Sequence, residues 1–213
     1  MQLKTLDRRI RHVKLELERD DLENLPAYPL PEGYRFVFWQ PGDERAWLDI
    51  EGPAGEFDTD EQGMVKWNKY FAPHTDELGH RMVFIEDAQG RKVATASAYF
   101  DVRGKDSRDV GYLHWVAVHP DAQGKGLAKP LISYVLTLLR DMGHTHTKII
   151  TQTTSWLAVG IYMSFGFRPE KENAVEGAEG WRIIRTLLDK PGLEQYDKLP
   201  PEECFVAAEK EIP

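Results

Sequence analysis

The chain of 213 residues is long enough for one domain with a sizeable core and short for two. Apolar residues make up 41% and charged residues 29%, which is typical of a soluble globular protein. A net charge of −8 argues against non-specific nucleic-acid binding, because that needs a basic surface. The single cysteine, Cys204, excludes an intrachain disulfide and a cysteine metal site, so the cytoplasm is the expected compartment.

The N-terminal residues show neither a secretory signal nor a membrane span. Residues 1–20 are charged throughout and lack an apolar centre. No apolar run approaches the roughly 20 residues that cross a bilayer. The alternation over residues 8–19 fits a strand or a charged helix. Prolines over residues 25–33 predict an extended linker, so we expect residues 1–33 to form an arm and linker.

The apolar patterning of the remaining chain alternates between strand and helix periods. It predicts strands over 34–41, 111–120, 148–154 and 181–188, a hairpin over 81–102, and helices over 43–51, 64–78 (broken near Pro73), 127–142 and 155–166. Antiparallel strands come first and one β-α-β unit follows. The order predicts a mixed α/β fold, in which a mostly antiparallel sheet is flanked by helices.

A glycine-containing loop, His119 to Pro130, joins the strand over 111–120 to the long helix. At a helix start the first backbone N–H groups lack partners and favour an anion, and glycines let a bulky anion approach them. An ordinary strand-to-helix turn explains the same residues. Neither a P-loop nor a dinucleotide fingerprint fits the glycine spacing.

Two segments resemble the motifs of the GNAT superfamily of N-acetyltransferases. The run Gln123-Gly124-Lys125-Gly126-Leu127-Ala128 matches the Q/R-x-x-G-x-G/A signature. Residues 155–167 resemble the second motif, N-x-x-A-x-x-x-Y followed by Gly-Phe, with Ser155 where the family usually has Asn. The resemblance covers roughly residues 34–188, so we expect a GNAT domain over 34–190 and a tail over 191–213.

The resemblance implies acetyl-coenzyme A as co-substrate, without a metal. Its pyrophosphate would bind the backbone N–H groups of the signature run, and its pantetheine arm would bind the strand backbone and the start of the second motif; the expected contacts are Gln123, Gly124, Lys125, Gly126, Leu127, Ala128, Val116, Ala117, Val118 and Ser155.

The resemblance assigns the general acid to Tyr162, whose phenol is protonated at neutral pH. His114 is the candidate general base, since an imidazole titrates near neutrality and alternation gives it the same side of the strand as Val116 and Val118. Tyr112 is the fallback. A purely structural role remains the alternative for Tyr162 and for His114.

The stretch between the first two strands is expected to shape the acceptor site. It carries aromatic residues and carboxylates: Trp47, Phe57, Trp67, Tyr70, Phe71, Glu56, Asp58, Asp60 and Glu61. These suit a cationic amine with an apolar body, whereas core aromatics beside a solvated loop are the structural alternative. We expect a small-molecule primary amine as partner, and neither nucleic acid nor membrane. A homodimer is compatible with the family.

Three other functions are open at this point. A non-catalytic acyl-CoA-binding module would share the fold, and Ser155 in place of Asn favours it slightly. A phosphate-binding domain of another fold would share the glycine loop. A longer acyl donor would use the same motifs.

Overall fold

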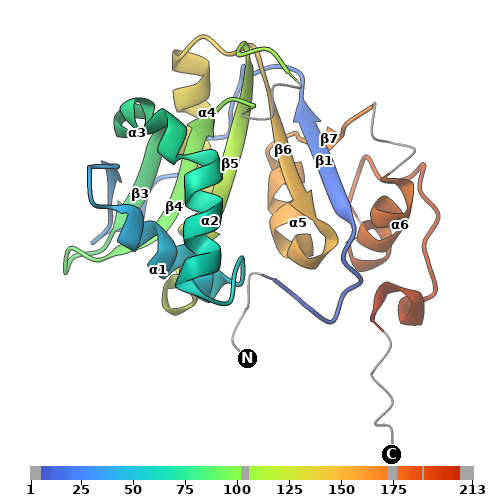
Figure 1. Ribbon diagram of the computed structural model, residues 1–213. Coiled ribbons are helices and arrows are strands. Elements are labelled where there is room, and N and C mark those ends of the chain that lie inside the picture. Colours follow the sequence, from blue (N-terminus) through green and yellow to red (C-terminus); the bar gives the residue numbers. More distant parts are fainter. Residues whose placement is uncertain (1–5, 102–105, 172–176, 189, 207–213) are drawn as a thin grey trace, which may run out of the picture. The chain divides into compact units, whose positions relative to one another are not determined.

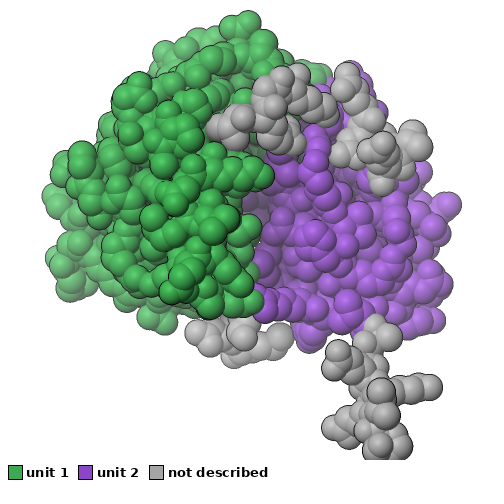
Figure 2. Space-filling model, in the orientation of Figure 1, with its two compact units in different colours: residues 1–5, 19–149 green, residues 6–18, 150–213 purple. Residues whose placement is uncertain are grey.

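The computed structural model describes residues 6–101, 106–171, 177–188 and 190–206 (Figure 1). The chain forms two compact units, which Figure 2 distinguishes by colour. The first comprises residues 1–5 and 19–149, and the second comprises residues 6–18 and 150–213. The predicted division into arm, domain and tail stays a prediction.

The first unit contains the predicted antiparallel strands. In spatial order these are β2 (Arg35–Phe38), β3 (Met82–Glu86), β4 (Lys92–Tyr99) and β5 (Val110–Val118). β6 (His146–Gln152) runs parallel to β5, with Val110 opposite His146 and Tyr112 opposite Lys148. The mixed α/β fold with a mostly antiparallel sheet is therefore confirmed.

α-Helices of the first unit flank these strands (Figure 1). They are α1 (Glu44–Ala54), α2 (Asp60–Tyr70), α3 (Thr75–Arg81) and α4 (Ala128–Asp141). The predicted break near Pro73 is confirmed, because a 3₁₀ turn over Ala72–His74 separates α2 from α3. α2 starts at Asp60 because the Thr59 side chain accepts a hydrogen bond from the backbone N–H of Gln62 (3.3 Å).

Trp47 of α1 is the centre of an aromatic core. It is fully buried, and its ring centroid lies 5.1–5.7 Å from those of Phe57, Trp67, Phe71 and Trp115. Rings at these separations in tilted and edge-to-face arrangements stabilise a core beyond their buried area. The structural interpretation therefore holds for Trp47, Phe57, Trp67 and Phe71, each at most 7% exposed.

The second unit combines an early and a late segment of the described chain. The ambiguous segment near residue 13 is a strand, β1 (Lys14–Arg19), which pairs antiparallel with β7 (Arg168–Pro169). Ile10 forms a β-bridge with Phe205 and shares a buried cluster with Ile183, Leu199 and Cys204. The unit also holds the short helix α5 (Trp156–Ser164).

The strand predicted over residues 181–188 is wrong. Residues 181–187 lie in a helix, α6 (Ala178–Leu187), and Leu188 is its extended C-cap residue. Its buried residues Gly180, Trp181, Ile183 and Ile184 follow the i, i+3, i+4 spacing of one helix face. The β-branched pair between two arginines resembles a strand locally, but packing of this face decides the structure.

Glu51 is a buried carboxyl on α1. It is 1% exposed, and burial, together with the nearby charge of Glu56, raises its pKa well above the usual value. The ionised form is therefore disfavoured in the folded protein.

We predict that Glu51→Gln stabilises the protein progressively as the pH rises. An acid with a raised folded pKa makes its full contribution to stability below its unfolded pKa, near 4.5, and loses it as the pH rises toward the folded pKa. The loss is about 1.4 kcal/mol for each unit of difference. Between pH 4.5 and 8, the Tm of Glu51→Gln should rise relative to that of wild type. The Tm of the control Glu32→Gln, at an exposed position, should change with pH as that of wild type does. Parallel curves for wild type and Glu51→Gln would contradict the prediction.

Candidate functional site

The loop before α4 presents helix-start amides that have no partner within the helix. The N-cap residue of α4 is Leu127, which makes no side-chain capping bond, and Pro130 in the first turn lacks an N–H group. The amides of Ala128 and Lys129 precede the first intrahelical bond, which runs from Leu131 N to Leu127 O (3.1 Å). This end of α4 is therefore suited to an anion.

Gly124 and Gly126 shape the same loop. Their φ angles are +75° and +79°, in the left-handed region that favours glycine. A Cβ on Gly124 would meet no heavy atom within 4 Å, and one on Gly126 would meet only Pro31 Cγ at 3.9 Å. The glycines thus serve backbone conformation rather than packing, and the space above them is open. This loop is termed the cradle (residues 123–128).

Gln123 anchors the cradle to β5. Its side-chain amide donates a hydrogen bond to the Val118 carbonyl at 3.0 Å. The Val118 carbonyl, an expected coenzyme contact, therefore already accepts one bond within the chain. Lys125 is exposed, and the Lys129 ammonium lies 5.0 Å from the Tyr28 ring.

A bulge interrupts β5 next to the candidate base. Ser97 lies opposite His114 and Thr95 lies opposite Ala117, so two residues of β5 oppose the single Ala96. One of the two, Trp115, has φ +48°, a rare value for a bulky residue.

The expectation that His114 shares a side with Val118 is wrong. His114 is on the side of Ala117, because both oppose alternate residues of β4, whereas Val118 opposes Ala94 on the other side. The extra residue in the bulge reverses the alternation. The predicted catalytic role of His114 loses this support, rests on the general chemistry of an imidazole, and stays a prediction.

His114 lies among aromatic rings. It stacks on Tyr99 at 5.7 Å with an interplanar angle of 11°, and meets Tyr70 and Phe71 at 5.4 and 5.8 Å. Tyr70 is partly exposed, unlike the core aromatics around Trp47. Among the predicted acceptor-site carboxylates, Asp60 pairs with Arg45 on the surface.

Tyr112, the fallback for His114, belongs to a cluster of hydrogen-bonded polar residues. It is 3% exposed, and its hydroxyl donates to the Asp106 carboxylate, which also pairs with Lys148 at 3.1 Å. Burial raises the pKa of Asp106, but the hydrogen bonds from Tyr112 and Lys148 outweigh it and the net shift is downward. The carboxylate therefore stays ionised and holds Tyr112 as a donor.

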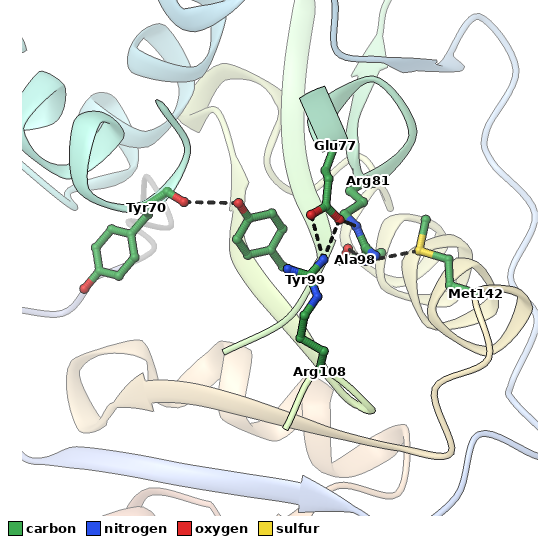
Figure 3. Close-up of polar contacts among 7 residues, drawn as sticks. All are labelled: Tyr70, Glu77, Arg81, Ala98, Tyr99, Arg108 and Met142. Carbon is green, nitrogen blue, oxygen red and sulfur yellow. Dashed lines mark hydrogen bonds and ion pairs between the residues drawn. The ribbon is translucent and has the colours of Figure 1, made fainter. Parts of the chain in front are cut away.

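A second cluster of hydrogen-bonded residues fixes α2 and α3 against β4 (Figure 3). The Tyr99 hydroxyl donates to the Tyr70 carbonyl at 3.2 Å, and Arg81 donates to the Ala98 carbonyl at 3.1 Å. Glu77 accepts hydrogen bonds from Arg81 and Arg108, both at 2.6 Å. Sequence reasoning missed this group, although the i, i+4 spacing of Glu77 and Arg81 is a recognisable signal.

The second unit carries the other two predicted site residues. Tyr162 on α5 is 5% exposed and meets Phe167 at 6.3 Å. Ser155 is the N-cap residue of α5, yet its side chain makes no capping bond. Its hydroxyl instead accepts a hydrogen bond from the Gln152 amide at 3.0 Å.

Neither a metal cluster nor a membrane-spanning helix is found in the part of the chain that the structure describes. No three His, Cys, Asp or Glu side chains gather as metal ligands there. No helix in those same residues is both long and apolar enough to cross a bilayer.

Comparison with known proteins identifies relatives of one kind. Residues 31–167 match the sequence profile described as Acetyltransferase (GNAT) family. Two curated relatives, both named mycothiol acetyltransferase, are 31% identical: that of Thermomonospora curvata over 162 residues, 67% of this chain and 47% of the relative, and that of Thermobispora bispora over 152 residues, 67% and 49%. The chain thus spans about half the length of these relatives.

Solved structures share the fold. A GCN5-related N-acetyltransferase from Sphaerobacter thermophilus aligns with a TM-score of 0.53 at 19% identity, covering 68% of this chain and 44% of that one. A glucosamine N-acetyltransferase region of a fungal multi-domain β-N-acetylglucosaminidase aligns with a TM-score of 0.55 at 12% identity, covering 76% and 20%.

Proposed function

The chain belongs to the GNAT family of acetyltransferases, and from this premise we propose that it transfers the acetyl group of acetyl-coenzyme A to a primary amine of a small molecule. The observation that carries the proposal is the cradle: two left-handed glycines under open space, followed by a helix without a side-chain cap. The relatives are named for a small molecule, mycothiol, which supports a small-molecule acceptor over a protein.

The residues present fit acetyl-coenzyme A. Amides of the cradle would hold its pyrophosphate, since the glycines leave that space open. The backbone of Val116, Ala117 and Val118 would hold the pantetheine arm as a pseudo-strand, and Ser155 would replace the usual Asn contact. When bound, the co-substrate supplies an activated acetyl thioester.

The chemistry needs one base and one acid. The amine nitrogen forms a bond to the acetyl carbon as the carbon–sulfur bond breaks. His114 accepts the proton that the amine loses, directly or through water, and Tyr162 donates a proton to the departing sulfur. A backbone N–H near Val116 would stabilise the oxyanion.

Binding can be tested at the cradle with a matched pair of glycines. Gly126 and Gly143 flank α4, with φ +79° and +89°, and both are exposed. Saturating acetyl-coenzyme A, about a hundredfold above its Kd, should stabilise wild type by about 2.7 kcal/mol, or roughly 5–10 °C. Gly126→Trp should lose this shift because the indole fills the open space, and Gly143→Trp should keep it.

The alternatives separate clearly in this experiment. Loss of the shift in both variants would mean that distortion of α4, and not the cradle, governs binding. If acetyl-coenzyme A does not raise the Tm of wild type, the co-substrate assignment is overturned and only the fold assignment remains.

Turnover tests the catalytic assignment. With acetyl-coenzyme A and a panel of alkyl amines, amino acids and amino sugars, we expect thiol release and an acetylated amine. Tyr162→Phe should lower kcat by about 10²–10⁴-fold while keeping the thermal shift, because it removes only the proton donor. Tyr196→Phe, another tyrosine of the second unit, should leave kcat unchanged. Co-substrate binding without turnover on any amine would favour the non-catalytic acyl-CoA-binding module.

A further inference from the structure

A cavity of about 560 Å³ lies in the first unit, outside the cradle and apart from the predicted catalytic residues. Its walls come from three segments of the chain: α1, the turn between β3 and β4, and the residue that follows β5. The lining residues are Ala46, Asp49, Pro53, Gly90, Arg91, Lys92 and His119. This volume is in the range of small-molecule sites.

Two nitrogen-bearing side chains meet in this cavity. Nη2 of Arg91 lies 3.0 Å from Nδ1 and 3.1 Å from Nε2 of His119. Its ion pair with Asp121 is long, at 3.7 Å. Half of the Arg91 side chain is exposed, so its remaining donors can reach a ligand without breaking a close ion pair.

Two other charged residues that line the cavity form ion pairs with residues outside it. Lys92 forms an ion pair with Asp43, and Asp49 forms one with Arg45. Arg91, whose own ion pair is long, is therefore the lining cation with donors left for a ligand. Burial, and then the positive charge of Arg91, lower the pKa of His119 against the opposite effects of Asp121 and Asp49, so the neutral imidazole is favoured.

The geometry points to a binding site for a phosphate group in this cavity. A planar guanidinium matches a phosphate bidentately, and an adjacent imidazole adds a donor from a second direction. The cavity is larger than a phosphate, so it has room for the organic part of a phosphate ester, with Asp49 available to accept a hydrogen bond from a hydroxyl.

Two sources could supply this phosphate group. One is the 3′-phosphate of coenzyme A, in which case the inference rests on the proposed function. The other is a separate phosphorylated molecule. The test therefore uses inorganic phosphate, acetyl-coenzyme A and acetyl-3′-dephospho-coenzyme A as probes, without an acceptor amine, so that it is independent of turnover.

Arg91→Met and Arg140→Met form a matched pair, since the two arginine side chains are 50% and 48% exposed and each lies near an aspartate. Binding is measured by calorimetry and phosphorus NMR on the full chain. Arg91→Met should weaken phosphate binding, or the preference for acetyl-coenzyme A over its dephospho analogue, by about tenfold or more, which is about 1.4 kcal/mol. Arg140→Met should change neither, and Arg91→Lys should fall between.

The outcome identifies the source. Loss of the preference in Arg91→Met assigns the cavity to the 3′-phosphate of the coenzyme. If Arg91→Met keeps the preference, and wild type binds phosphate through Arg91 even in the presence of acetyl-coenzyme A, the cavity is assigned to a separate phosphorylated molecule. If Arg91→Met leaves both the phosphate affinity and the preference unchanged, the inference is overturned, whatever the outcome of the acetyl-transfer assay.

Discussion

The extra residue in β5 is the constraint on which the arrangement of the first unit depends. Regular antiparallel pairing would continue the alternation through residue 118 and turn His114 and Val118 to one side. The bulge opposite Ala96 breaks this alternation and places Trp115 in the left-handed region. Trp115 packs at 5.1 Å from Trp47, so the irregular backbone is held by the aromatic core of α1 and α2. Strain at a bulky residue persists only where packing of this kind determines it.

The two ends of β5 carry different kinds of structure as a result. Before the bulge, Tyr112 is fixed by Asp106, which also pairs with Lys148. After it, Gln123 returns to the Val118 carbonyl and sets the start of the cradle. A strand that is rigid at one end and feeds an open glycine loop at the other is suited to holding a long ligand along its length, which is the role proposed for it here.

Local signals predicted most of the elements, and contacts between distant residues decided the rest. The hairpin, the break at Pro73 and the cradle all follow from residues that are neighbours in sequence. The bulge depends on pairing between β4 and β5, which no alternation pattern encodes. Residues 181–188 predict a strand because their β-branched pair is compatible with either element, and only the burial of Trp181 and Ile184 decides for the helix. For the candidate site, the motif residues were recognisable, whereas the partners that hold Tyr112, Tyr99 and Ser155 were not.

The bridge between Ile10 and Phe205 has a consequence for how the second unit can form. β1, the first strand of the second unit, leaves the ribosome long before β7 and the segment that carries Phe205 have been made. At about 5–20 residues per second, the wait lasts roughly 10–40 s. During that time the first unit can complete its own hairpin contacts, whereas β1 has no native partner in β7 and exposes Leu15 and Leu17, which are fully buried in the finished structure. We therefore expect closure of the second unit to be a late, non-local step of folding, before which the exposed leucines of β1 favour aggregation.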